Sequence, residues 1–214
     1  MTTTTPTTFT TTSSPQCILI RLVLFALLFF ATPTCAQHST IYIIRHGEKK
    51  WALGCLSAKG QQRANRLASV FNSIPSPNHA LFNTPDHIFA NYYDDPIDCE
   101  RCIQTVTPIA KKLNITVNST YGFPTKLGGN QLAAQTWRTL ITSNNKKKTT
   151  ILVAWEHVNI KPLTEALGVQ SSLLPTWSGS DYDTVYVLLF NNTGHVINFT
   201  IAAENLTTTQ KYIE

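Results

Sequence analysis

Two short segments and one arginine carry the side chains best suited to chemistry. Arg45-His46-Gly47-Glu48 follows an apolar run, and Glu156-His157 follows another. Arg101 lies between them, at the start of a stretch with helical spacing. Arginine makes paired hydrogen bonds to oxyanions and stays charged at any relevant pH, and histidine can act as nucleophile, donor or proton carrier. These residue types predict a pocket for a tetrahedral anion.

The surrounding elements predict that these side chains meet at one edge of a sheet. Apolar, β-branched runs at 40–44, 87–90 and 149–155 are typical of buried parallel strands. In such sheets ligands bind beyond the carboxyl ends of the strands, and that is where His46 and His157 follow. Periodic apolar residues predict helices at 57–71, 101–113, 131–143 and 161–167, the first capped by Ser57.

The last part of the chain predicts two strands, at 184–190 and 195–202, joined by the turn Asn191-Asn192-Thr193-Gly194. Alternation of strands and helices followed by a hairpin predicts an α/β fold. We expect a three-layer α/β/α sandwich whose sheet is mainly parallel, with an antiparallel hairpin at its edge. No repeat or linker divides it, so a single domain is expected.

Four segments, in order along the chain, resemble motifs of the histidine phosphatase superfamily, the phosphoglycerate-mutase-like group. They are IYIIRHGE at 41–48, LSAKGQQRA at 56–64, ERCIQT at 100–105 and ILVAWEH at 151–157. One Arg-His-Gly triplet is a weak signal, but four ordered segments are a strong one. The resemblance implies that His46 becomes phosphorylated, that Arg45 and Arg101 bind the transferred phosphoryl group, and that His157 completes the cradle.

The chemistry of phosphoryl transfer agrees with that assignment. It depends on positioning and on neutralising the equatorial oxygens, which two guanidinium groups and an imidazole can do without a metal. We therefore expect a phosphomonoesterase that needs no metal and no cofactor and acts on a small phosphorylated substrate. The alternatives are a weak or inactive phosphate-binding protein of the same fold and a mutase-like phosphotransferase.

The general acid departs from the family pattern. Members commonly carry a glutamate between the second arginine and the last strand, but no Asp or Glu occurs from 106 to 155. Glu156 is the first candidate, because partial burial beside a phosphate would raise its pKa. Its position next to His157 counts against it, since neighbouring strand residues point to opposite faces. Asp94 and Asp95 are the runners-up, followed by Asp98 and Glu48.

The N-terminal segment has the order of a secretory signal peptide. A Thr-rich stretch and Arg21 precede an uncharged apolar run of about ten residues, half of what a membrane-spanning helix needs. Small residues at Thr34 and Ala36 predict cleavage after Ala36, so 1–36 is assigned as signal and 37–214 as the phosphatase-like domain. We expect a secreted protein without a stable membrane span; a retained signal-anchor is the alternative.

Glycosylation and disulfide bonding are expected from the same context. Asn-X-Ser/Thr triplets begin at five asparagines: Asn114, Asn118, Asn191, Asn198 and Asn205. Outside the signal the cysteines are Cys55, Cys99 and Cys102, so one disulfide and one free thiol are expected, with Cys55 bonded to Cys99 or Cys102.

The net charge of +5 would favour anionic partners. No basic stripe with interleaved aromatic residues is present, so nucleic acid is not expected to bind. Arg63 and Arg66 lie on the first predicted helix and are expected to be solvated. The sequence leaves the oligomeric state and the substrate open.

Overall fold

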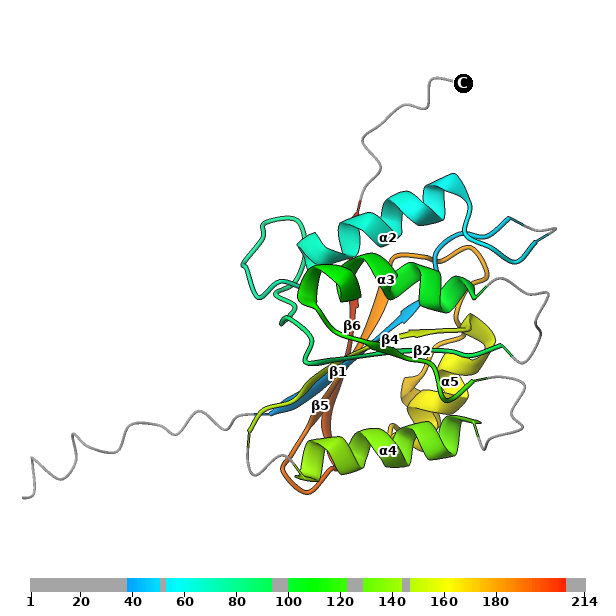
Figure 1. The fold of residues 1–214 in the computed structure, drawn as a ribbon. Helices are drawn as coiled ribbons and strands as arrows, with labels where there is room; N and C mark the ends of the chain where they lie inside the picture. The colour runs from blue at the N-terminus through cyan, green and yellow to red at the C-terminus, as the bar shows by residue number, and fades with distance from the viewer. Residues whose placement is uncertain (1–37, 51–52, 94–99, 123–128, 144–146, 207–214) are drawn as a thin grey trace, which may run out of the picture. The chain divides into compact units, whose positions relative to one another are not determined.

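A six-stranded sheet runs through the middle of the structure (Figure 1). The computed structural model describes residues 38–50, 53–93, 100–122, 129–143 and 147–206. The strand order is β3-β2-β4-β1-β5-β6, in which the first four strands are parallel and β5 and β6 are antiparallel. The strands are β1 (Ser39–Arg45), β2 (His87–Ala90), β3 (Val117–Asn118), β4 (Thr150–Trp155), β5 (Thr184–Phe190) and β6 (Val196–Ala203).

Helices cover both faces of the sheet, α2 and α3 on one face and α4 and α5 on the other (Figure 1). The helical elements are α2 (Ala58–Val70), α3 (Arg101–Leu113), α4 (Gly129–Ser143), α5 (His157–Ala166) and a 3-10 turn, η1 (Ser171–Leu173). Ser57 caps α2 as predicted, because its hydroxyl accepts a hydrogen bond from Gly60 N at 3.2 Å. The predicted α/β sandwich with an antiparallel edge pair is confirmed.

Two apolar clusters fill the space between the layers. Along β1, Tyr42 and Ile44 pack towards α2 and α3, whereas Ile41 and Ile43 pack towards α4 and α5. This alternation follows from the two-residue period of a strand, and it explains why buried strands in a doubly covered sheet are apolar throughout. Within the described residues no helix combines the length and the apolarity that crossing a membrane requires.

The largest difference from the predicted elements concerns the start of α5. A helix was expected at 161–167, but α5 begins at His157, directly after β4 and the N-cap residue Glu156. Pro162 lies inside this helix, in its second turn. The strand therefore stops before Glu156, and the objection that Glu156 and His157 must point to opposite faces does not apply.

Candidate active site

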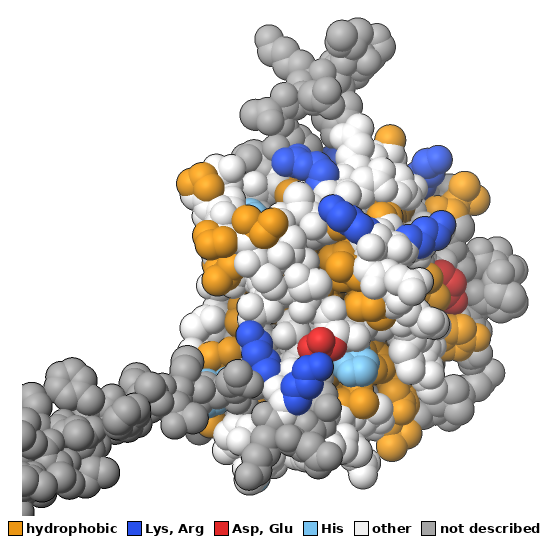
Figure 2. Space-filling model, turned by 60° about the vertical axis from the view of Figure 1, so that its left-hand side comes forward, with side chains coloured by type: hydrophobic (Ala, Val, Ile, Leu, Met, Phe, Trp, Pro, Cys, Tyr) orange, Lys and Arg blue, Asp and Glu red, His pale blue; other side chains and the backbone are white. Residues whose placement is uncertain are grey.

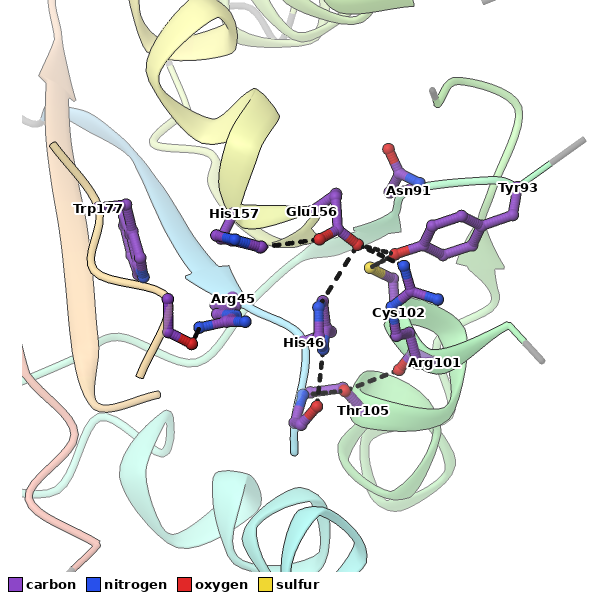
Figure 3. Close-up of polar contacts among 12 residues, drawn as sticks. Arg45, His46, Asn91, Tyr93, Arg101, Cys102, Thr105, Glu156, His157 and Trp177 are labelled. Carbon is purple, nitrogen blue, oxygen red and sulfur yellow. Dashed lines mark hydrogen bonds and ion pairs between the residues drawn. The ribbon is translucent and has the colours of Figure 1, made fainter. Parts of the chain in front are cut away.

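Strand register brings the predicted site residues to one edge of the sheet. Arg45 at the end of β1 is opposite Trp155 at the end of β4, and Ala90 at the end of β2 is opposite Ala154. The residues that follow these strands therefore emerge side by side, and Arg101, the first residue of α3, points towards Glu156 (Figure 3). His46, Glu156 and His157 face one another across this small space.

His46 is held in a defined tautomer. Its side chain is fully buried, at 0% exposure, and its Nδ1 lies 2.7 Å from the carbonyl oxygen of Gly47. A carbonyl oxygen only accepts, so Nδ1 must carry the proton and Nε2 keeps its lone pair. Nε2 has no hydrogen-bond partner among the described residues, and burial lowers the pKa of His46. The result is a neutral imidazole with a free ring nitrogen aimed into the site.

Glu156 lies in front of that nitrogen. Its Oε2 is 3.4 Å from His46 Nε2 and accepts hydrogen bonds from the Tyr93 hydroxyl at 2.6 Å and from Arg101 Nη2 at 2.7 Å. Its Oε1 is 2.8 Å from Nδ1 of His157. All four groups lie around one carboxylate that is itself 7% exposed.

These contacts reverse the expected shift in the pKa of Glu156. Desolvation by burial acts to raise the pKa, as expected from the sequence, but the hydrogen bonds from Tyr93 and Arg101 and the charge of Arg101 lower it below its usual range. The cause is the set of donors around the carboxylate, which includes the hydroxyl of Tyr93. The raised pKa was expected beside a bound phosphate, and for that state it stays a prediction.

Arg45 lies on the opposite side of His46 from Arg101 (Figure 3). Its guanidinium carbon is 4.0 Å from the ring centroid of Tyr182, and its Nη1 donates to the backbone oxygens of Gly179 at 2.6 Å and Asp181 at 3.2 Å. Arg101 is held in a similar way, 4.1 Å from the ring centroid of Tyr93. Each arginine is thus stacked on a tyrosine, which restricts its orientation.

The loop after β1 is held by α2 and α3. Gly47 N donates to the hydroxyl of Thr105 at 2.8 Å, and that hydroxyl donates to Arg101 O at 2.8 Å. A Cβ on Gly47 would lie 3.1 Å from the backbone of Gly60. Gly47 therefore permits the close approach of α2.

Three side chains of metal-binding type meet in the site. Ligand atoms of His46, Glu156 and His157 lie within 4.8 Å of one another. The two guanidinium groups beside them favour an anion over a cation, because a divalent ion would add to positive charge already present. This cluster was not predicted from the sequence. That the protein needs no metal stays a prediction.

Other predicted residues lie elsewhere or outside the described residues. Asp94, Asp95 and Asp98 fall outside them. Glu48 pairs with Lys59 at 3.1 Å. Together with Arg63 and Glu204, these two residues line a separate cavity of about 340 Å³.

Arg63 was expected to be solvated, which is wrong. It is 8% exposed, its Nε donates to Glu204 at 2.9 Å, and its Nη1 donates to the backbone oxygen of Arg45 at 3.0 Å. The position of α2 against the end of β6 buries it, and the sequence alone does not show that packing.

Of the two pairings predicted for Cys55, the one with Cys102 is wrong. Cys55 is disulfide-bonded, whereas Cys102 is a free, buried thiol beside the hydroxyl of Tyr93. Cys99 lies outside the described residues.

Sequence reasoning missed Tyr93, Tyr182 and the backbone at 178–181. Tyr93 follows the end of β2, so the rule that pointed to the residues after β1 and β4 could have found it. The segment before β5 reaches the same edge because β5 is antiparallel to β1. Finding Tyr182 required the strand order.

Comparisons with solved structures place the fold. The protein histidine phosphatase SixA, complexed with tungstate, overlaps with a TM-score of 0.51 at 15% identity, covering 78% of this chain and 97% of its own. Mycobacterial hydrolase 2 overlaps with a TM-score of 0.50 at 12% identity, covering 77% and 89%. Phosphoserine phosphatase from Entamoeba histolytica, in complex with 3-phosphoglyceric acid, has a TM-score of 0.48 at 19% identity, covering 76% and 96%.

No protein-family model and no curated protein sequence matches the chain. The likeness to known proteins is therefore structural. At 12–15% sequence identity it concerns the fold alone. The resemblance seen in the four sequence motifs is confirmed at that level: the part of the chain that the structure describes has the fold of the histidine phosphatases.

Proposed function

We propose that the chain is a secreted phosphomonoesterase that works through a phosphohistidine on His46 and needs no metal. The observation that carries the proposal is the state of His46, buried and neutral, with Nδ1 bound to Gly47 O and Nε2 aimed at the site. A nucleophile must present a lone pair to phosphorus, and this tautomer does so at Nε2.

The two arginines and His157 around His46 match a phosphoryl group in geometry, and the arginines match it in charge. Arg101 and His157 already bind a carboxylate at 2.7 and 2.8 Å, so their donors are aimed at an oxyanion in front of Nε2. Arg45 approaches from the other side, held by Tyr182. Donors fixed in this way stabilise the charge on the equatorial oxygens of the transition state without having to reorganise.

The reaction then has two steps. In the first, His46 Nε2 forms a bond to phosphorus while the bond from phosphorus to the substrate oxygen breaks, and an acid protonates the departing alkoxide. In the second, water attacks the phosphohistidine, releasing phosphate and restoring His46. Glu156 is the acid nearest the reacting atoms among the described residues, 3.4 Å from Nε2.

A phosphate-binding protein without turnover is the second candidate. One observation favours it: an ionised Glu156 lies between the groups that would hold phosphate, so an incoming anion must displace it. Retention of a buried neutral histidine in the attacking tautomer favours the enzyme, because binding alone would need the arginines but no nucleophile.

The test is phosphate release from a panel of phosphomonoesters, with p-nitrophenyl phosphate included, in the presence of a chelator. We expect turnover that the chelator leaves unchanged, that vanadate inhibits, and that is lost in His46→Ala together with an acid-labile phosphoenzyme. His195→Ala, which changes an exposed histidine, serves as the control and should stay active. Turnover that survives His46→Ala, or that needs added zinc or magnesium, would overturn the proposal.

A further inference from the structure

The carboxylate of Glu156 has the contacts that the proposed function assigns to a bound phosphoryl group. It faces His46 Nε2 at the end of β1, and it binds Arg101 on α3 and His157 on α5. The Tyr93 hydroxyl, from the loop after β2, adds a fourth contact. Figure 3 shows these partners converging on the two carboxylate oxygens. A planar anion with two acceptor oxygens thus takes the place of a tetrahedral anion.

A phosphoryl dianion and an ionised Glu156 cannot share these partners. Like charges within a few ångströms disfavour each other's ionised form, as in carboxylate pairs that hold one proton between them. His157 Nδ1 has a single hydrogen, and the donors of Arg101 Nη2 and His157 Nδ1 are already engaged by Glu156, so an oxyanion at the same place competes with Glu156 for them. An arriving oxyanion must therefore take over those donors and leave Glu156 without the contacts that keep it ionised.

We propose that Glu156 is an internal substitute for the phosphoryl group, and that it takes up one proton from solvent when an oxyanion displaces it. The inference rests on the proposed function only for the identity of the natural ligand. It assigns a place to the proton: in the empty site Glu156 is ionised, and in the occupied site it is a neutral acid next to the bound anion.

This proton is the one that the first chemical step needs. As the bond from phosphorus to the ester oxygen breaks, the electron pair goes to that oxygen, and the proton of the Glu156 carboxyl group moves to it to form the alcohol. Glu156 is then an anion again, as in the empty site. Substrate binding thus brings the proton with it. Glu156 is ionised before the oxyanion binds and is protonated when the first chemical step needs an acid.

Other groups that face Glu156 bear on the test. His46 and His157 are titratable and could themselves take up a proton beside a dianion. Arg45 and Arg101 are already charged, whereas burial raises the pKa of Tyr93 and of Cys102 and keeps both neutral. Among the described residues that face Glu156, only the two histidines compete with it for the proton, so the experiment must separate a carboxyl group from an imidazole.

The experiment is titration calorimetry of the purified protein with tungstate, which is a dianion at pH 7 and above and brings no proton of its own. Repeating it in buffers of different ionisation enthalpy counts the protons taken up. We expect about one proton per tungstate for the wild type, and an affinity that falls about tenfold per pH unit between pH 7 and 8. Glu165→Gln, an exposed glutamate on the same helix, should match the wild type.

Glu156→Gln should bind tungstate at least tenfold more tightly than the wild type at pH 7.5, with no dependence on buffer, because the competing charge is gone. In the wild type, infrared difference spectra should gain the carbonyl band of a protonated carboxyl group on tungstate binding, a readout that needs no variant. Tungstate binding without proton uptake, or uptake that persists in Glu156→Gln, would overturn the inference. Failure of the proposed function appears separately, as tungstate binding with proton uptake but no ester turnover.

Discussion

At the residue scale, His46 shows how one hydrogen bond and burial decide what a side chain can do. The bond to Gly47 O selects the tautomer, and burial lowers the pKa below the ordinary value of 6.5. A histidine with a lowered pKa stays neutral to lower pH, so the nucleophile should survive acidification.

We therefore expect kcat/KM for p-nitrophenyl phosphate to hold or rise as the pH falls from 8 to 6.5, and to decline only below 6.5. The profile of kcat/KM reports the enzyme before substrate binds. Measurement at constant ionic strength checks this. A decline that begins above pH 6.5 would mean that His46 is charged when the site is empty.

Glu156 is the residue whose role depends most on the leaving group. Glu156→Gln keeps the shape but removes the proton, so turnover of an alkyl phosphate should fall about 10²- to 10⁴-fold. The loss should be much smaller with p-nitrophenyl phosphate, because its phenolate departs without a proton. Steady-state kinetics on both substrates measures the difference. Equal losses on both would show that Glu156 only positions its neighbours.

Most of the site could be predicted at this scale, because His46 and His157 directly follow apolar strands. What could not be predicted was the electrostatic state of Glu156. It depends on the hydroxyl of Tyr93 and on the rotamer of Arg101, which come from other elements. A sequence motif identifies the groups, but a pKa depends on distances between them.

At the element scale, the packing of α2 against the loop after β1 positions His46. Gly60, in the first turn of α2, has no room for a side chain, since a Cβ there would overlap the backbone oxygen of Glu48 and lie 2.9 Å from its nitrogen. Helix propensity alone would favour alanine by about 1 kcal/mol. The contact is with backbone, which cannot rotate away, so the clash outweighs that gain.

Gly60→Ala should therefore destabilise the protein by about 1–3 kcal/mol, as overpacking does, and reduce activity, because Glu48 is two residues from His46. Urea denaturation and the p-nitrophenyl phosphate assay measure the two effects. Gln62→Ala, at an exposed position of the same helix, is the control and should change neither. A Gly60→Ala protein as stable as the wild type would show that α2 can shift freely.

A second link between elements lies behind the site, where Arg63 of α2 meets Glu204 after β6. Glu204 is fully buried, and desolvation raises its pKa to about 7 even though Arg63 acts to lower it. A carboxyl group with a raised folded-state pKa binds its proton more tightly in the folded state. Its contribution to stability is therefore greatest below pH 4.5 and is lost as the pH rises towards 7.

The expected result is that the free energy of unfolding of the wild type, relative to Glu204→Gln, falls as the pH rises from 5 to 7. Glu204→Gln cannot titrate, so the difference between the two proteins isolates this group. Urea unfolding at pH 5, 6 and 7 measures it. Glu204→Ala should cost more, about 3–5 kcal/mol, because Arg63 is left buried without its partner. A difference that does not change with pH would show that Arg63 keeps Glu204 ionised throughout.

Most elements were predictable within a few residues, because their apolar periodicity is local. The strand predicted at 87–90 and the helix predicted at 101–113 have the same bounds in the structure. The two-residue strand β3 and the early start of α5 could not be predicted, since β3 exists only through its pairing with β2 and α5 begins where the strand ladder ends.

At the scale of the whole molecule, strand order makes the site. The order β2-β4-β1-β5 places the ends of three parallel strands beside the start of an antiparallel one, so residues far apart in the sequence surround His46. This order is a property of the whole fold, and the sequence predicted only its class. On the face shown in Figure 2, lysine and arginine side chains are scattered rather than gathered into a stripe.

We expect the mature, secreted protein to begin at Gln37 and to carry N-linked sugar. The motif around Ala36 predicts cleavage there, and β1 begins at Ser39, so removal of 1–36 would leave the sheet complete. Four of the five sequon asparagines are exposed: Asn114, Asn118, Asn198 and Asn205. Mass spectrometry of the secreted protein should find an N-terminal peptide that begins at Gln37. Treatment with peptide-N-glycosidase in heavy-oxygen water should label sequon asparagines and leave Asn78, an exposed asparagine outside any sequon, unlabelled. Secreted material with Met1 intact would contradict the assignment of 1–36 as a cleaved signal. Secreted material without label at any sequon would contradict the assignment of the sequons as glycan sites.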